Sequence, residues 1–559
     1  VADLNGDGRL DIVGLGANAQ VGRAASRGSK SYRWQVLRPR AATATGDQRI
    51  NSFGIGGEVE LRSGLHAQKQ VITSPLVHFG LGEAAGAEVV RITWPNGALQ
   101  AEFDTKADQT VAATQRLKGS CPWLFAWNGR EMAFVTDVLW RSPLGLRINA
   151  QATADVLMTE DWVKLRGDQL APRDGAYDLR ITAELWETHF FDLVSLLVVD
   201  HPEGTEVFVD ERFAVPPPKP EVIATGPVRP FASVRDDKGQ DVSAIAAARD
   251  SRYVDFADRG PYQGITRTHF VEMELPDSAP RSAPLYLIAQ GWIHPTDSSI
   301  NVAIGQGTHE MPQGLSLQVA DARGRFHEVR GGLGFPAGKD KSILINMDGL
   351  FPAAGPRRLR LATNLEIFWD RLGWAVARPD VTPRITRLEL TAADLDYRGY
   401  STTDQTDASV PERPRYQLAG TGARWRDLEG YYTRFGDVMA LVRRVDDRYV
   451  IMNAGDELRV RFPEAPTPAA GLVRDFVAIT DGWEKDGDYN TGFSRTVLPL
   501  PTHRTGRYDT PPRRLEDDPV YREHAREFAE DHTRDVTADA VRDALRVAPD
   551  AAASAVRKP

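Results

Sequence analysis

The first residues of the chain carry oxygen-bearing side chains at the spacing of a calcium-binding loop. Asp3, Asn5, Asp7 and Asp11 occupy loop positions 1, 3, 5 and 9, and the carbonyl oxygen of Arg9 is a further candidate ligand. Ca²⁺ takes about six to eight oxygen ligands, and this short loop supplies several of them. We therefore predict a Ca²⁺ site here, with an acidic surface turn that holds no metal as the alternative.

The residues around this loop are not those of an EF-hand. That motif needs a Glu at loop position 12 and flanking helices, whereas Leu10 to Val13 continue directly as a strand. The arrangement resembles the FG-GAP/VCBS repeat of β-propellers. One repeat cannot bury its apolar faces alone, so residues 1–20 are expected to be the last of several blades, followed by a connector at 21–45. Since the chain begins at Val1 inside the motif, the other blades and a signal peptide are expected in a missing amino-terminal part.

Three blocks rich in glycine turns follow, each with a short strand. Val59 and Leu61 alternate with polar neighbours, and so do Ile92 and Trp94, which is the period of strands with one buried face. The blocks resemble the ASPIC/UnbV module, which lies beside FG-GAP repeats in secreted proteins of the cartilage acidic protein type, here in a bacterial form. The resemblance covers residues 46–118 and departs from the family at Gly57, where alanine is usual. The matching residues are Asn51, Gly54-Ile55-Gly56, His78-Phe79-Gly80-Leu81-Gly82 and Ile92 with Trp94-Pro95-Asn96-Gly97.

Composition limits the function classes. The chain has 559 residues, 48 Gly and 36 Pro, which favours several domains of short strands and turns. A net charge of −9 disfavours a nucleic-acid partner, and the apolar runs are far shorter than the about 20 residues that span a bilayer. Cys121 is the only cysteine, so an internal disulfide is excluded.

The remaining chain is predicted to be mainly β. Asn128-Gly129 is a predicted hairpin turn, and the prolines of 216–220 are a predicted domain boundary. Polar residues 401–420 suggest a linker, and Tyr521 to Glu530 and Ala538 to Arg546 are candidate helices. The predicted regions are a β-rich domain at 119–215, a β-sandwich-like domain at 221–400, a small β-rich region at 421–500 and a charged helical tail at 501–559.

Two groups of residues are weaker metal candidates. Asp486, Asp488 and Asn490 repeat the alternate oxygen spacing of a Ca²⁺ loop, with a solvated turn as the favoured alternative. His189, Asp192, Asp200 and His201 lie around one apolar strand. Strand alternation would send several of these four side chains to different faces, so polar ends of a core strand are the favoured interpretation.

Two carboxylates could support glycoside hydrolysis. Glu184 and Glu187 flank Trp186, and a half-exposed strand with charged faces explains them equally well. Trp483 is a second aromatic residue with carboxylates nearby in the sequence. We predict no catalytic and no cofactor-binding residue other than the Ca²⁺ ligands.

The expected function is that of an exported, calcium-binding protein, extracellular, periplasmic or at the cell surface, that binds a protein or a surface glycan. The location and architecture follow from the resemblance, which implies no reaction. A secreted carbohydrate-active enzyme and a structural assembly subunit are the alternatives, and an aromatic-lined cleft with two carboxylates would favour the enzyme.

Overall fold

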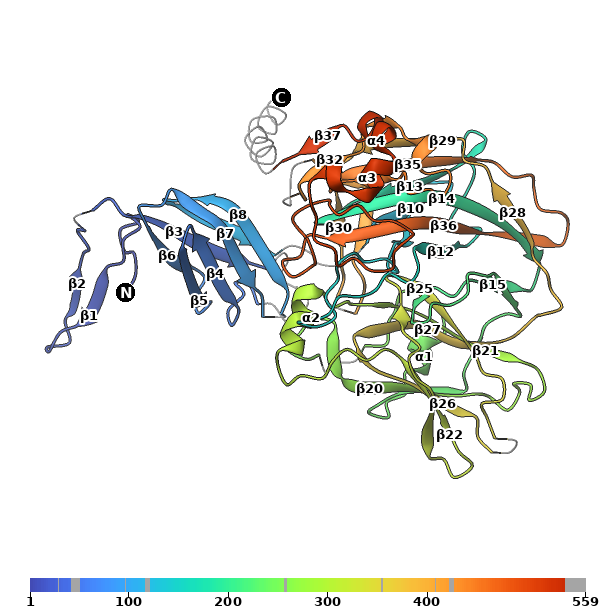
Figure 1. Ribbon diagram of the computed structural model, residues 1–559. Coiled ribbons are helices and arrows are strands. Elements are labelled where there is room, and N and C mark those ends of the chain that lie inside the picture. Colours follow the sequence, from blue (N-terminus) through green and yellow to red (C-terminus); the bar gives the residue numbers. More distant parts are fainter. Residues whose placement is uncertain are drawn as a thin grey trace, which may run out of the picture. The chain divides into compact units, whose positions relative to one another are not determined.

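The computed structural model (Figure 1) describes residues 1–28, 30–41, 51–95, 97–115, 121–255, 259–352, 355–407, 409–421 and 427–537. The chain divides into two compact units, Val1–Lys118 and Gly119–Pro559. Both are mainly β, as predicted, with many antiparallel sheets and few short helices. None of the described helices is long and apolar enough to cross a membrane.

The first unit consists of a hairpin and two small sheets. A three-stranded sheet has the order β6-β3-β9, and a four-stranded sheet has the order β5-β4-β7-β8. Their apolar faces share one core, in which Val59, Leu61, Ile92 and Trp94 are buried as the alternation predicts. The strands are β1 (Ile12–Leu15) and β2 (Val21–Ala24) of the hairpin, then β3 (Arg33–Arg40), β4 (Glu58–Ser63), β5 (His66–Val71), β6 (Val77–Gly82), β7 (Gly86–Thr93), β8 (Leu99–Lys106) and β9 (Gln109–Thr114).

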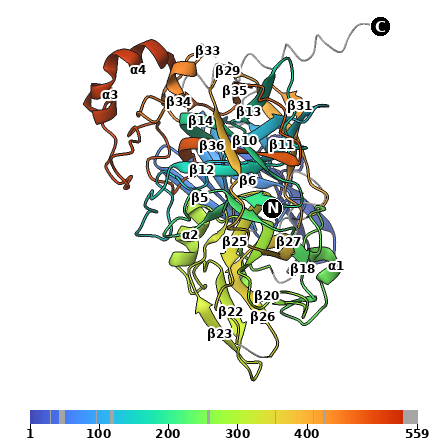
Figure 2. The same ribbon diagram turned by 90° about the vertical axis from the view of Figure 1, so that its right-hand side faces the viewer.

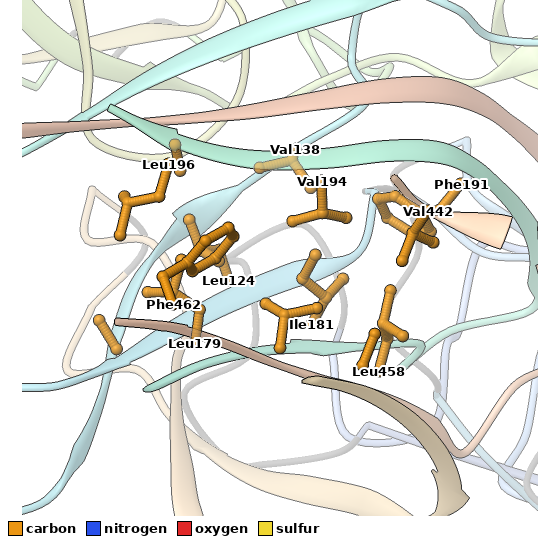
Figure 3. Close-up of a cluster of buried hydrophobic side chains, with 14 of the residues drawn as sticks. Leu124, Val138, Leu179, Ile181, Phe191, Val194, Leu196, Val442, Leu458 and Phe462 are labelled. Atoms are coloured by element: carbon orange, nitrogen blue, oxygen red, sulfur yellow. The ribbon is translucent and has the colours of Figure 1, made fainter. Parts of the chain in front are cut away.

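The second unit contains a β-sandwich built from two distant parts of the chain. Its core lies between Leu124, Ile181 and Leu458 of one sheet and Val194 and Leu196 of the other (Figure 3). The first sheet has the order β11 (Met132–Asp137), β10 (Trp123–Trp127), β13 (Ala176–Thr182), β35 (Asp456–Pro463), β29 (Ala392–Tyr397) and β33 (Gly436–Asp437). The second has the order β12 (Glu160–Leu165), β36 (Leu472–Asp486), β14 (Glu187–Pro202) and β28 (Arg384–Leu388), with β34 (Val450–Met452) also paired to β14. The predicted regions 119–215 and 421–500 therefore share both sheets.

A second sandwich is inserted between β14 and β28. Figure 2 shows its strands β20, β22 and β26 grouped below β14 and β36. One sheet has the order β18 (Arg229–Pro230), β27 (Ile367–Val376), β21 (Leu285–Ile293) and β25 (Lys341–Asn346). The other has the order β19 (Ser233–Asp236), β20 (Ile265–Glu274), β26 (Arg358–Leu365), β22 (Ser316–Ala320) and β23 (Phe326–Arg330). The helices α1 (Ser243–Ala246) and α2 (Ser298–Gly305) also belong to this part.

Short elements complete the second unit. Residues 401–420, predicted as a linker, instead contain the paired strands β30 (Tyr400–Asp404) and β31 (Arg413–Gly420). The helix predicted from Tyr521 to Glu530 is interrupted at His524, and the helix predicted from Ala538 lies outside the described residues. The remaining elements are β15 (Glu206–Phe208) with β17 (Ile223–Thr225), β16 (Arg212–Phe213) with β24 (Phe335–Pro336), β32 (Gly430–Tyr432) with β37 (Arg534–Val536), the 3₁₀ turns Met439–Leu441 and Leu515–Asp517, α3 (Pro519–Glu523) and α4 (Ala525–Asp531).

Candidate functional site

Strands β14 and β36 bring together four polar residues at one end of their sheet. The antiparallel register sets Glu187 opposite Asp486 and His189 opposite Glu484. Directly opposed residues lie on the same face of a sheet, and so do alternate residues along one strand. Glu187, His189, Glu484 and Asp486 therefore share one face.

Three of these side chains form a tight buried cluster. One side-chain ligand atom from each of Glu187, His189 and Glu484 lies within 4.8 Å of the other two. His189 is fully buried, and its Nε2 lies 3.6 Å from a carboxylate oxygen of Glu187. Neither ring nitrogen of His189 has a hydrogen-bond partner among the described residues, and the same holds for Oε2 of Glu484. His189 and Glu484 therefore carry buried nitrogen and oxygen atoms that have no hydrogen-bond partner in the described part of the chain.

Burial controls the protonation of this cluster. Removal from water lowers the pKa of His189 to about 3, so its imidazole is neutral at pH 7. Burial, with a smaller contribution from the charge of Asp486, raises the pKa of Glu484 to about 8. Burial also raises the pKa of the Cys121 thiol, and the carboxylates of Glu484 and Glu187 add to that increase. Without a bound cation, the Glu484 carboxyl is therefore mostly protonated at neutral pH.

The cluster lies beside a cavity of about 560 Å³ at the junction of the two sandwiches. The described acidic residues of its lining are Asp155, Glu187, Asp297, Glu484 and Asp486, while most of the other lining residues are apolar. Four of these apolar residues are exposed large side chains, namely Ile148, Leu157, Val215 and Met311. The site therefore combines buried acidic groups on its floor with a rim that is mostly apolar.

A second cluster, Asp192, Asp447 and His503, has a different character. His503 Nδ1 lies 2.6 Å from Asp447, and its Nε2 lies 2.6 Å from Asp481. Asp192 accepts the backbone N–H groups of Asp446 and Asp447. Burial opposes the charge of His503, but its hydrogen bonds to Asp447 and Asp481 outweigh that effect and raise its pKa to about 10. Both ring nitrogens are already committed, so this cluster is a closed ion-pair network.

The four residues predicted together around one strand are separated in the structure. His189 joins the two glutamates, and Asp192 joins the His503 network. At the other end of β14, Asp200 pairs with Arg474, and His201 lies 3.5 Å from Asp475. Only Asp200 and His201 therefore agree with the favoured interpretation of the four residues as polar ends of a core strand.

Glu184 and Glu187 are both only 5% exposed, so the half-exposed strand that was the alternative explanation for them is wrong. Glu184 accepts hydrogen bonds from the N–H of Ser401 at 2.6 Å and from Arg398 at 3.1 Å, whereas Glu187 lines the cavity. Trp483 is also buried, at 1% exposure, and contacts the His503 ring. Trp186 and Trp483, the aromatic residues singled out from the sequence, are not among the described residues that line the cavity.

Glu484 is the residue of the cluster that sequence reasoning missed. The chain carries Glu-x-His at 187–189 and Glu-x-Asp at 484–486, and each pair has the spacing of one strand face. That spacing was the available signal. Only the pairing of β14 with β36 shows that the two pairs face the same cavity.

The amino-terminal loop turns tightly at two glycines. Gly6 and Gly8 both adopt positive φ, at 75° and 78°. Asp3 accepts the N–H groups of Gly6 and Gly8 at 2.8 Å, and Asp7 accepts that of Arg9 at 2.9 Å.

Asp11 has further partners in the same unit. It is 1% exposed, and it accepts hydrogen bonds from Ser26 N–H at 2.9 Å and Arg23 at 2.7 Å. The Ser26 bond, together with Arg23, holds the pKa of Asp11 below its usual value despite the opposing effect of burial. Ca²⁺ at Asp3, Asn5, Asp7, Arg9 and Asp11 stays a prediction.

The weaker calcium candidate lies at the junction of the two sandwiches. Asp488 is fully buried, whereas Asp486 and Asn490 are half-buried. Asp488 accepts a hydrogen bond from Ser299 Oγ at 2.5 Å, and Asn490 donates to the same Ser299 hydroxyl at 2.9 Å. Asp488 and Asn490 thus anchor the first turn of α2, while Ca²⁺ at Asp486, Asp488 and Asn490 stays a prediction.

Comparison with known proteins identifies one part of this mainly β chain. The sequence model of the ASPIC and UnbV family matches residues 47–119. The first unit therefore contains an ASPIC/UnbV domain, which confirms the resemblance to that module, whereas the FG-GAP/VCBS repeat stays a prediction. No curated protein and no solved structure matches the chain.

Proposed function

We propose that this chain is an exported, calcium-binding protein whose second unit holds a small ligand with an apolar body. The observation that carries this proposal is the cavity of about 560 Å³ between the two sandwiches. Ligand sites have volumes of roughly 300 to 1,000 Å³, are mostly apolar and contain a few polar groups that orient the ligand. This cavity has the size and the lining of such a site.

The rim of the cavity supports a binding role. Ile148, Leu157 and Met311 are 44%, 53% and 38% exposed, and Val215 is 62% exposed. Apolar side chains that gather on a surface mark sites where another molecule binds, whereas scattered ones need no explanation. These four line one cavity although they come from separate segments of the chain.

Export, the Ca²⁺ cofactor and a protein or surface-glycan partner are parts of the same proposal. They are supported by the ASPIC/UnbV domain and by the Asp-rich loop that precedes it. The cavity adds a small-molecule site in the second unit to that picture.

A fluorescence titration of the full chain tests the cavity. N-phenylnaphthylamine, an uncharged apolar fluorophore, is expected to bind saturably at one site. Ala154 lines the cavity, so Ala154→Trp should fill space there and weaken binding at least about tenfold. Val329→Trp adds the same ring at an exposed position of β23 and should leave binding unchanged. Equal affinity in the two variants would show that the dye binds elsewhere and would refute the proposal.

One observation favours a carbohydrate-active enzyme as the alternative. Glu187 and Glu484 lie within 4.8 Å of each other, and the raised pKa of Glu484 leaves one of them able to donate a proton near neutral pH. Retaining glycosidases place two carboxyl groups about 5 Å apart. The test is whether the parent protein releases sugar from a panel of polysaccharides. If it does, and if Glu187→Gln or Glu484→Gln abolishes that release, the enzymatic function would replace the binding function.

A further inference from the structure

We propose that Glu187, His189 and Glu484 bind one divalent transition-metal ion at the floor of the cavity. The inference goes beyond the proposed function, because a metal ion can bind these three residues whether or not a ligand fills the apolar part of the cavity. An experiment can therefore refute the metal site without refuting the ligand site, and the reverse.

The donor set selects the class of metal. Ca²⁺ and Mg²⁺ prefer oxygen ligands alone, whereas an imidazole nitrogen beside carboxylates suits Zn²⁺ and similar first-row ions. Glu187 and Glu484 supply carboxylate oxygens, and the buried ring of His189 supplies a nitrogen. Zn²⁺ is accordingly the reference probe.

The buried imidazole is the observation that separates this cluster from an ordinary acidic patch. His189 is fully buried, and neither of its nitrogens has a hydrogen-bond partner among the described residues. An unsatisfied polar group in the interior is costly, and metal coordination would satisfy one nitrogen. A dication would also balance the negative charge of the Glu187 and Glu484 carboxylates when both bind it.

The scaffold suits a preformed site with an open position. The three ligands project from β14 and β36, which are paired along nearly their whole lengths, so the strands fix the spacing. Three protein ligands leave a coordination position free, as in catalytic zinc sites. Glu187 and Glu484 also line the cavity, so a ligand there would meet the metal with its polar end.

The test is a calorimetric titration of chelator-treated full chain with Zn²⁺, in excess Ca²⁺ to saturate the amino-terminal loop. One Zn²⁺ per chain is expected to bind. His189→Asn and Glu484→Gln should each weaken binding about 100-fold or more, because each removes a ligand. His503→Asn is the matched control and should leave the affinity unchanged, since both nitrogens of His503 are already bonded to Asp447 and Asp481.

Two results would overturn the proposal. The first is that the parent protein binds Zn²⁺ no more tightly than His189→Asn does. The second is that His503→Asn loses as much Zn²⁺ affinity as His189→Asn does. X-ray absorption at the zinc edge of the parent protein reads the ligands directly, so the proposal stays testable if a variant fails to fold. One imidazole with oxygen neighbours is expected there, and a sulfur ligand or no imidazole would count against the site.

Discussion

His78 Nε2 donates a hydrogen bond to the carbonyl oxygen of Gly8 at 2.7 Å, which ties the amino-terminal loop to β6 of the ASPIC/UnbV domain. The Trp34 ring stacks on His78, with 6.2 Å between centroids and 13° between planes. Gly8 lies against the same Trp34 ring. The predicted calcium loop is therefore packed onto the domain that follows it.

Substitution of Gly8 should loosen this contact more than substitution of Gly6. Both have positive φ, so alanine at either position costs about 1 kcal/mol or more. A Cβ at Gly8 would lie 1.8 Å from the Trp34 ring, whereas one at Gly6 would meet nothing within 4 Å. Hydrogen exchange should show faster exchange in β3 for Gly8→Ala than for Gly6→Ala. Equal exchange in both would mean that Trp34 does not hold the loop.

Ca²⁺ should stabilise the first unit through the amino-terminal loop. A ligand that binds only the folded state adds RT ln(1 + [L]/Kd), about 2.7 kcal/mol at a hundredfold excess over Kd. Mg²⁺ should add much less, because it demands strict octahedral geometry. Asp7→Ala should abolish the gain, whereas Glu83→Ala, which removes an exposed acid outside the loop, should keep it. Calorimetry with no Ca²⁺ signal, or with an equal Mg²⁺ signal, would refute the site.

Trp94 should be a major contributor to the core of the ASPIC/UnbV domain. Its side chain is 2% exposed, and its Nε1 donates to Gln100 at 3.2 Å. Trp94→Ala should lower the free energy of unfolding of this domain by about 3 to 5 kcal/mol. Val71→Ala on the exposed side of β5 should change it by less than about 0.5 kcal/mol. Amide exchange of β4 and β7 across a denaturant series measures both, and a loss under about 1 kcal/mol for Trp94→Ala would contradict the burial.

The His503 network should make stability depend on alkaline pH. The folded state raises the pKa of His503 from 6.5 to about 10, so its contribution is fully present below about pH 6.5 and is lost as pH rises through 10. Asp192 and Glu484, whose pKa values are raised to about 7 and about 8, titrate in the same range. The measurement is therefore the difference in urea midpoint between the parent and His503→Asn.

That difference should shrink steadily from pH 6.5 to 10. His327→Asn removes an exposed histidine and is the control for loss of a ring alone. A pH-independent difference between the parent and His503→Asn would show that the ion pairs with Asp447 and Asp481 do not stabilise the fold.

Local patterns in the sequence determined the local structure of this protein. Alternation around Val59 and Ile92 predicted strands with one buried face, and the turn at Asn128-Gly129 predicted the hairpin of β10 and β11. The ASPIC/UnbV blocks were recognisable for the same reason, because their glycines and strand residues lie within one short stretch. Each of these signals depends on neighbours in the chain, so one sequence contains them in full.

Tertiary structure alone decided the composition of the candidate site. His189 and Glu484 are far apart in the chain, and the register of β14 against β36 makes them opposite neighbours. A shift of one residue in that register would turn Glu484 to the other face of the sheet. The register is set by the burial of whole strands in a core shared by distant segments, such as Leu196 with Phe462. No local pattern encodes that pairing, and the insertion of a second sandwich between β14 and β28 completes the cavity only in the folded chain.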